Sequence, residues 1–467
     1  MDTHEASLRE RVTTALANKR QLVNIQVATD RFFSGRLNAL ETLPHADAMR
    51  DLARAIRAHT ISRLDEYLLQ FEQAFTALGG VVHWARDAEE ARQIVLRIAQ
   101  DAGVSRIAKS KSMVTEEIAL NAALEASGLQ VVETDLGEYI AQLSGDRPSH
   151  LLAPVLHLSR QDVGRIFAEK LHVPYTDDIS ELTAIARRNL REVFLAANMG
   201  ITGCNFAVAE TGTICLVTNE GNGRMVTSLP RVHVVIMGME RIVPTVKDLG
   251  VMLQLLPRSG TGQKMCSYTS LVTGPRRRGD PYAPQEMHVV IVDNGRSKAL
   301  AGDLAEILYC IRCSACLNAC PVYRTIGGHA YGGVYSGPVG SVISPVLGGL
   351  AAFPDLPHAS TLCGACKDAC PVHIDLPTLL LRLRRDTVQE GLSPAWTAAG
   401  MKGYAWVTRR YGRYRLLTAL AGAVSRLARG RWLTWLPGPL GGWTRYRAFP
   451  PFAPETFQKR NRGGRHE

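Results

Sequence analysis

The spacing of apolar residues changes twice along the chain. Over 51–78 apolar side chains recur every three or four positions, which predicts helices that end at Gly79 and Gly80. From about 80 to 295 short apolar runs alternate with amphipathic stretches. The runs predict strands at 81–85, 105–110, 129–135, 214–218, 232–238 and 287–293, and the stretches predict helices at 89–103, 115–128 and 178–200. This alternation is typical of an α/β domain with a largely buried sheet.

A different pattern follows Asn294. Cysteines lie there among short helix-like pieces, and glycines and prolines interrupt the uncharged segment 331–353, which predicts a loop and not a membrane span. Further on, 413–432 has the spacing of an amphipathic helix. Its apolar face consists of Leu416, Leu417, Leu420, Val424 and Leu427. The chain is therefore divided into a helical segment (1–75), the α/β domain (76–295), a small cysteine-rich domain (296–385) and a C-terminal segment (386–467).

Charge is concentrated in the C-terminal segment. The 467 residues carry a formal charge of +11, and 381–467 alone hold 17 basic against 4 acidic residues and five of the six tryptophans. Such a segment predicts docking to an acidic protein or an anionic membrane surface, or packing of its apolar face on the cysteine-rich domain. No recognised nucleic-acid-binding module is present, so no nucleic-acid partner is expected. The first thirty residues lack a secretory signal, which predicts a cytoplasmic protein, free or peripheral at the inner membrane face.

Seven of the ten cysteines fall within 61 residues, which favours metal ligation over disulfides. The first run has the spacing C-x2-C-x2-C-x3-C-P that bacterial ferredoxins use for two clusters, in which the fourth cysteine ligates the other cluster. The second run has only three cysteines. Crossing the fourth ligands assigns cluster 1 to Cys310, Cys313, Cys316 and Cys370, and cluster 2 to Cys320, Cys363 and Cys366.

The second set is one thiolate short, because Ser360 stands where its first cysteine would be. Cluster 1 is therefore expected to be 4Fe-4S, and cluster 2 either 3Fe-4S or 4Fe-4S. The fourth iron of a 4Fe-4S cluster 2 could be bound by Ser360, by water, or by a distant thiol. The distant thiols are Cys204, Cys215 and Cys266.

Zinc and histidine ligands are the alternatives to this interpretation. Zinc prefers closed sets of four ligands, and a run that ends in Cys-Pro twice over is poorly explained by it. His329 and His373 could act as ligands, although a histidine beside a cluster more often forms hydrogen bonds or packs. Two such clusters carry single electrons, which predicts an electron conduit.

The α/β domain has no dinucleotide fingerprint and no P-loop. Glu210 is the one acid in an apolar turn, and a turn or capping role is at least as well supported as a catalytic one. Lys109 and Lys111 could bind an anion, but solvated lysines are the commoner case.

Four stretches together resemble a known family: KSKSMVTEEIALN, NFAVAETGTICLVTNEGN, CIRCSACLNACPVYRTIGGHAYG and LCGACKDACPV. The family is that of lactate-utilisation iron-sulfur proteins, the B subunits of three-protein bacterial systems that oxidise L-lactate to pyruvate, and the match runs from about 70 to 380. It implies an α/β lactate-utilisation domain related to CoA transferases and sugar-phosphate isomerases, then an α-helical ferredoxin domain and a basic C-terminal helical segment. The family pattern also has seven cluster cysteines.

The resemblance also implies a function and partners. The protein would be an electron-transfer subunit that acts with the other two lactate-utilisation subunits. The alternative is a CoA-transferase- or isomerase-like enzyme with its site near Glu210 and accessory clusters. The first explains more of the chain, because such an enzyme has no use for two clusters.

Overall fold

A computed structural model describes residues 7–280, 282–427, 431–438, 441–445 and 447–453. The chain divides into two compact units, Met1–Glu390 and Gly391–Glu467. The first contains the three segments predicted over 1–75, 76–295 and 296–385, and the second begins close to the start predicted at 386. No helix among the described residues is long and apolar enough to cross a bilayer.

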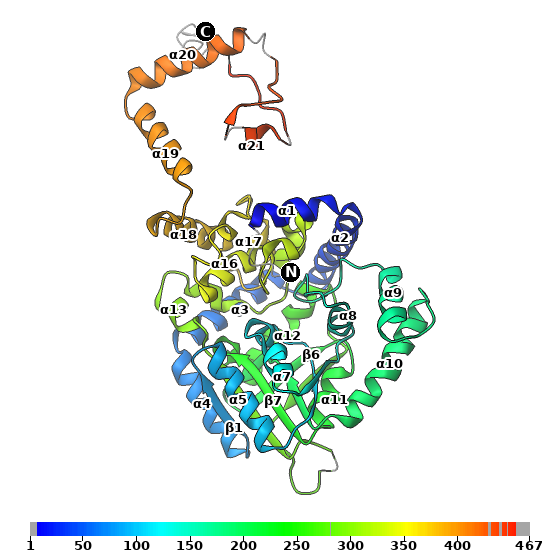
Figure 1. Ribbon diagram of the computed structural model, residues 1–467. Coiled ribbons are helices and arrows are strands. Elements are labelled where there is room, and N and C mark those ends of the chain that lie inside the picture. Colours follow the sequence, from blue (N-terminus) through cyan, green and yellow to red (C-terminus); the bar gives the residue numbers. More distant parts are fainter. Residues whose placement is uncertain (1–6, 281, 428–430, 439–440, 446, 454–467) are drawn as a thin grey trace. The chain divides into compact units, whose positions relative to one another are not determined.

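A six-stranded parallel sheet forms the centre of the first unit (Figure 1). From edge to edge it consists of β1 (Val81–Ala85), β10 (Glu286–Val292), β7 (Val232–Gly238), β4 (Met199–Thr202), β2 (Arg106–Lys109) and β3 (Gln130–Glu133). All neighbouring pairs are parallel, for example Val81 with His288 and Ile107 with Met199. The α/β domain with a largely buried sheet that the apolar runs predict is thus confirmed, and the structure shows the central sheet to be parallel.

Helices cover both faces of this sheet, because alternate strand residues point to opposite sides. One face packs on α5 (Ala88–Asp101), α6 (Met113–Glu117) and α7 (Leu120–Ala126), and the other on α8 (Leu136–Ser144), α10 (Ile179–Ala196) and α11 (Asn222–Ser228). In β2, Ile107 belongs to the first core and Ala108 to the second. Asp87 and Asp178 cap the first turns of α5 and α10 through their side chains.

A second sheet has the order β8 (Ile242–Val243), β5 (Phe206–Val208), β6 (Thr213–Thr218) and β9 (Tyr268–Val272). The strand predicted at 214–218 therefore lies in this small mixed sheet, where β6 pairs antiparallel with β5 and β9. The predicted helix over 115–128 is two helices, α6 and α7, because Ala119 adopts a left-handed conformation between them. The remaining α/β helices are α9 (Arg160–Lys170) and α12 (Val246–Gly260).

The N-terminal helices are α1 (Leu8–Ala17), α2 (Lys19–Glu41), α3 (Ala46–Ser62) and α4 (Leu64–Ala77). Helix α2 packs on α12 of the α/β part and on α14 (Ala315–Ala319) and α15 (Pro321–Ile326) of the cysteine-rich part. The latter part contains α13 (Arg296–Ala301), α14 (Ala315–Ala319), α15 (Pro321–Ile326), α16 (Gly337–Gly348), α17 (Ala365–Ala369) and α18 (Leu376–Gln389).

The prediction of a loop over 331–353 is wrong. Residues Gly337–Gly348 form α16, with Pro338 in its first turn and a second proline, Pro345, inside it. Pro338 is compatible with a helix start because its missing N–H would be unpaired there in any case. Burial against α14 and α18 outweighs the weak helix propensity of the glycines.

The second unit contains α19 (Ala395–Thr408), α20 (Tyr411–Leu427) and α21 (Gly441–Thr444). Within α20, Leu416, Leu417 and Leu420 are exposed, and the side chains of Val424 and Leu427 lie outside the described residues. Trp432 and Trp435 are also exposed. The helix predicted at 413–432 is thus present as far as Leu427, and the three leucines of its apolar face that the structure describes lie at the surface.

One buried ionic network joins the parts of the first unit. Arg296, which follows β10, donates both terminal nitrogens to Glu117 at 2.9 Å and its Nε to Glu240 at 2.6 Å. Arg312 of the cysteine-rich part lies 3.3 Å from the same Glu240 carboxylate. Arg57 of α3 donates to the backbone oxygens of Ile242 at 2.6 Å and Leu308 at 2.9 Å.

The charges in this network depend on one another. Burial alone would raise the pKa of Glu240, but the guanidinium groups of Arg296, Arg241 and Arg312 outweigh it and lower the pKa to about 2. A carboxyl with a lowered pKa stabilises the fold above its unfolded pKa of about 4 and loses that contribution as the pH falls towards 2.

Arg296→Met should lower the free energy of unfolding by about 3–5 kcal/mol, because it leaves the buried Glu117 carboxylate without its cation and removes the closest of the three guanidinium groups around Glu240. The measurement is the denaturant midpoint of the anaerobic holoprotein. Arg188→Met on the exposed side of α10 is the matched control and should change the free energy by less than about 0.5 kcal/mol. Equal midpoints for the two variants would show that the network does not stabilise the fold.

Candidate iron-sulfur centre and the adjoining cavity

Four of the predicted thiols line one small cavity. Cys310, Cys313, Cys316 and Cys370 surround it together with Ile311, Val339 and Val372. Cys310 and Cys313 lie on a short loop that leads into α14, and Cys316 lies in the first turn of that helix. Cys370 ends α17, which packs against α14. The structure thus places Cys370, from the second run, with the first three cysteines of the first run.

The other three thiols form a second group. Cys320 ends α14 before Pro321, and Cys366 lies in α17. Cys320 and Cys363 are close enough to raise the pKa of Cys366 beyond the effect of burial, which is the larger cause. Cys363 is exposed, whereas the other two are buried. The grouping in space is the crossed one, and the assignment of these thiols as ligands stays a prediction.

The backbone of the two runs repeats, which explains why the thiols of each run converge. Arg312 and Ser314 have positive φ angles of 58° and 63°, and Leu362 and Gly364 have 56° and 87° at the equivalent positions. Residues in the left-handed region turn the chain sharply, so that successive side chains face one point. Such a conformation is strained for the non-glycine residues, which is common at functional sites.

Ser360 occupies the position equivalent to Cys310. The N–H of Arg312 donates to Cys310 Sγ at 3.4 Å, and the N–H of Leu362 donates to Ser360 Oγ at 3.1 Å. Thr361, next along the chain, instead lowers the pKa of Cys363 through its hydroxyl. The distant thiols lie elsewhere: Cys215 is inside β6, and Cys204 and Cys266 line another cavity.

The donor sets fit iron-sulfur clusters. Burial raises the pKa of Cys370 to about 11 and that of Cys366 to about 12, so closely spaced thiols here would be neutral unless metal ions stabilised the thiolates. Backbone N–H groups of Tyr323 and Ile374 donate to Cys320 and Cys370 at 3.5 and 3.4 Å. The Tyr331 hydroxyl is buried near Cys316, Cys320 and Cys366 and has no hydrogen-bond partner among the described residues. An unpaired buried hydroxyl indicates that a further acceptor belongs there.

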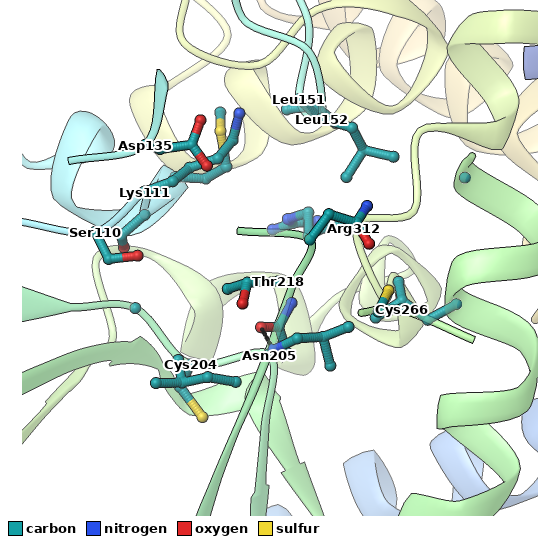
Figure 2. Close-up of a pocket in the computed structure, with 18 of the residues that line it drawn as sticks. Ser110, Lys111, Asp135, Leu151, Leu152, Cys204, Asn205, Thr218, Cys266 and Arg312 are labelled. Atoms are coloured by element: carbon teal, nitrogen blue, oxygen red, sulfur yellow. Dashed lines mark hydrogen bonds between the residues drawn. The ribbon is translucent and has the colours of Figure 1, made fainter. Parts of the chain in front are cut away.

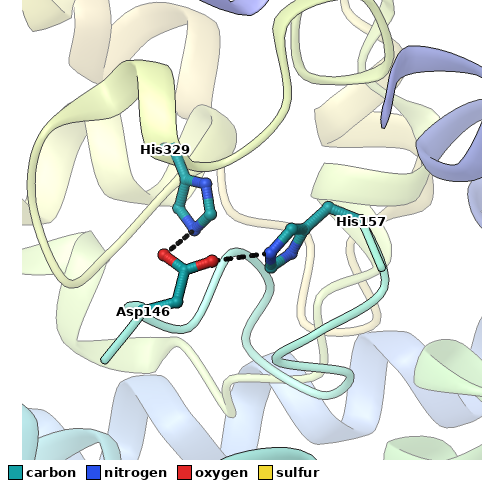
Figure 3. Close-up of side chains that lie close together, drawn as sticks. All are labelled: Asp146, His157 and His329. Atoms are coloured by element: carbon teal, nitrogen blue, oxygen red, sulfur yellow. Dashed lines mark hydrogen bonds and ion pairs between the residues drawn. The ribbon is translucent and has the colours of Figure 1, made fainter. Parts of the chain in front are cut away.

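The rings of both histidines have oxygen atoms as polar neighbours. His329 Nε2 lies 2.8 Å from the carbonyl oxygen of Arg147 and 3.6 Å from Asp146, whose other oxygen accepts from His157 at 2.8 Å (Figure 3). A ring nitrogen that donates to a carbonyl oxygen cannot also bind a metal, so His329 Nε2 is not available as a ligand in this arrangement. Asp146, His157 and His329 instead link the 146–157 loop to the segment after α15. His373 lies 3.4 Å from Asp51.

A larger cavity of about 310 Å³ adjoins the first thiol group. Arg312 and Leu151 line both cavities. Figure 2 shows Ser110, Lys111 and Asp135 on one side of it and Arg312 and Cys266 on the other. Sequence reasoning missed this site, because its residues come from segments far apart in the chain and share no motif.

The residues proposed for the α/β domain have different surroundings. Glu210 is exposed, does not line this cavity, and accepts a hydrogen bond from the N–H of Val246 at 3.1 Å, at the start of α12. It is thus a helix-capping carboxylate. The expectation of solvated lysines is wrong: Lys109 is buried and pairs with Glu116 at 3.0 Å and with Glu133, and Lys111 pairs with Glu138 at 2.5 Å.

Comparisons with known proteins agree with this architecture. Residues 68–292 match the LUD domain, 306–374 the 4Fe-4S dicluster domain, and 385–463 the C-terminal domain of lactate utilisation protein B. The fold and the thiol groups thus define an iron-sulfur protein with an α/β LUD domain and a ferredoxin-type domain.

Relatives identify the family within that class. The chain is 48% identical to "Lactate utilization protein B" of Geobacillus kaustophilus over 93% of each chain. It is 46% identical to that of Macrococcus caseolyticus and 44% identical to that of Bacillus cereus, over at least 96% of each chain. The chain belongs to the lactate utilization protein B family. The match to a crystal structure of a duf162 family protein from Deinococcus radiodurans covers 49% of this chain and 98% of that one, with 17% identity and a TM-score of 0.28.

Cysteine exchanges test the crossed grouping. Cys370→Ser should damage the cluster held by Cys310, Cys313 and Cys316, and Cys320→Ser should damage the other. Each of these two cysteines is expected to ligate the cluster whose other cysteines lie in the opposite run. EPR of the reduced protein separates the two signals. If Cys320→Ser removed the same signal as Cys313→Ser, the crossed assignment would be wrong.

Proposed function

We propose that this chain is the iron-sulfur electron-transfer subunit in the oxidation of L-lactate to pyruvate and acts with the other two lactate-utilisation subunits. The observation that carries the proposal is the pair of adjacent thiol groups, one lining a small cavity and one open to the surface at Cys363. Bound clusters would supply single-electron carriers. The names of the relatives support the connection with lactate.

The chain itself would hold the clusters and shape their surroundings. Cys310, Cys313, Cys316 and Cys370 would hold the first, with Ile311, Val339 and Val372 excluding water. Cys320, Cys363 and Cys366 would hold the second. Exposure of Cys363 supports the second group as the one that exchanges electrons with a partner, because electron transfer between proteins needs close approach of the carriers.

The α/β domain is proposed to have a fold like that of CoA transferases and sugar-phosphate isomerases, as the family resemblance implies. An enzymatic site at Glu210 is not favoured, because that carboxylate caps α12 at the surface.

Ser360 is proposed to complete a 4Fe-4S cluster at the second group. The support is the repeat of backbone and hydrogen bond that places Ser360 Oγ where Cys310 Sγ lies in the first run. An oxygen in this position leaves the conformation of the run unchanged and replaces one soft ligand by a harder one.

Ser360→Ala should leave one iron fewer per chain and produce the EPR signal of an oxidised three-iron cluster, whereas Ser360→Cys should keep the four-iron form. Iron and sulfide analysis with EPR on anaerobic protein measures both. Thr361→Val removes the neighbouring hydroxyl and should not change the iron content. A Ser360→Ala protein with the iron content and spectrum of the wild type would exclude Ser360 as a ligand.

The C-terminal unit is proposed to dock on an acidic partner subunit. Its supporting features are the excess of basic residues and the exposed apolar side chains of α20. An anionic membrane surface at the inner face of the membrane would attract the same features, at about 1 kcal/mol per basic residue near the surface, and liposomes distinguish the two.

Reconstitution tests the role of the chain. The purified protein should contain redox-active clusters but oxidise no L-lactate with an artificial acceptor, and should support oxidation only when both partner subunits are added. Glu210→Gln should not alter this activity. Robust lactate dehydrogenation by the single chain would contradict the electron-conduit role.

The same assay examines the C-terminal unit. A chain that ends at Glu390, where the first compact unit ends, should keep both clusters and lose partner-dependent activity. High salt should lower the partner-dependent activity of the full-length chain in the same way, because it screens the basic residues. Sedimentation with anionic liposomes identifies membrane docking instead. Unchanged partner binding by the truncated chain, or loss of its clusters, would show that the unit is a structural cover.

A further inference from the structure

The cavity next to the first thiol group lies where the topology of the parallel sheet favours a ligand. Strands β4 and β2 are neighbours, but the chain continues from β2 to β3 on one side and from β4 to β7 on the other. Ligands of open α/β sheets bind at the carboxyl ends of strands at such a switch point. Residues that directly follow these strands, including Ser110 and Lys111 after β2 and Cys204 and Asn205 after β4, line the cavity.

One wall of the cavity carries two buried guanidinium groups with unused hydrogen-bond donors. Arg241 is 7% exposed, its Nε has no partner among the described residues, and its closest carboxylate oxygen belongs to Glu240 at 3.8 Å. Glu240 is already engaged by Arg296 at 2.6 Å and by Arg312 at 3.3 Å. Nε and Nη1 of Arg312 also lack hydrogen-bond partners in the described part of the chain, and its guanidinium group lies over the Tyr335 ring, 4.9 Å from the centroid. A buried cation without a full partner is costly, so this wall favours an anion.

The two arginines differ in what they face. Arg312 lines the cavity of the first thiol group as well, so part of its charge serves the thiolates there. Arg241 lines the larger cavity and not the small one. An anion in the larger cavity would therefore depend chiefly on Arg241.

The opposite wall is acidic. Asp135 follows β3 and Glu220 follows β6, and both line the cavity. Burial, followed by the charge of Asp135, raises the pKa of Glu220 to about 7, so its carboxyl group can donate or accept a hydrogen bond near neutral pH. Lys111 lies on the same wall and pairs with Glu138 at 2.5 Å. The carboxyl groups of this wall would accept a hydrogen bond from a hydroxyl group, and a protonated Glu220 would donate one to a carbonyl group.

We propose that the cavity binds a small organic anion, whose carboxylate or phosphate contacts Arg241 and Arg312 and whose hydroxyl or oxo group faces Asp135 and Glu220. A volume of about 310 Å³ is sufficient for such a ligand. Because Arg312 and Leu151 also line the first thiol cavity, the ligand lies beside the first group of thiols. The binding site is argued from these walls alone and does not rest on the proposed electron-transfer role.

Calorimetric titration of the anaerobic full-length holoprotein tests the proposal with four probes: L-lactate, pyruvate, propionate and inorganic phosphate. L-Lactate or pyruvate should bind more tightly than propionate, which lacks the oxygen on the second carbon. Arg241-dependent binding of phosphate without binding of the carboxylates would assign the phosphate class instead. Arg241→Gln should weaken binding by at least about tenfold, because it removes a charged hydrogen-bond donor. Arg188→Gln, exposed on α10, is the matched control and should bind as the wild type does.

Iron content, measured in the same samples, separates loss of the site from loss of the fold. If Arg241→Gln loses its clusters, Arg241→Lys is the second variant: it keeps the charge without the guanidinium fork and should still weaken binding. Glu220→Gln should reduce the preference for lactate over propionate. Absence of binding by all four probes, or unchanged affinity in an Arg241 variant with full iron content, overturns the proposal. Anion binding by a chain that fails in reconstituted lactate oxidation would contradict the electron-transfer role and leave this site in place.

Discussion

The buried carboxylate of Glu240 is the constraint on which the arrangement of the first unit depends. A charge removed from water must be neutralised where it lies, and three elements supply the neutralising groups: Arg296 after β10, Arg241 beside Glu240 itself, and Arg312 in the cysteine loop. Arg57 of α3 adds hydrogen bonds to backbone oxygens of the α/β part and of the cysteine-rich part. These contacts hold the N-terminal helices, the sheet and the cysteine-rich part together, which explains why they form one compact unit.

The same constraint reaches the thiols. Arg312 lies between Cys310 and Cys313, and its left-handed conformation allows the thiols to turn towards α17 while its side chain points back to Glu240. The backbone of Arg312 thus orients the thiols, and its side chain attaches the same loop to Glu240. More guanidinium groups than carboxylates surround Glu240, and this excess also makes one wall of the larger cavity positive. The same cluster of charges therefore stabilises the fold and sets the charge of that wall.

How much the sequence could predict depends on how local the signal is. The buried strands and the crossed grouping of the thiols follow from short spacings, and the structure has both. Strand β4 (Met199–Thr202) was hidden at the end of the predicted helix 178–200, because four residues buried on both faces show no alternation. Helix α16 was hidden by its glycines and prolines, since its helical state comes from burial. The wall formed by Arg241 and Arg312 depends on tertiary contacts, which no spacing records.

The repeated cysteine runs show why a nearly symmetric motif gives two unequal sites. Backbone turns and N–H donors are equivalent in both runs, so convergence of the side chains does not require identical ligands. What differs is the environment: the first group is enclosed by apolar residues and lies beside Arg312, whereas the second has an exposed Cys363 with the Thr361 hydroxyl next to it. Reduction potentials of clusters depend on ligand charge, hydrogen bonds and solvent access. Clusters held in these two environments would therefore differ in reduction potential even though the two cysteine runs are nearly the same.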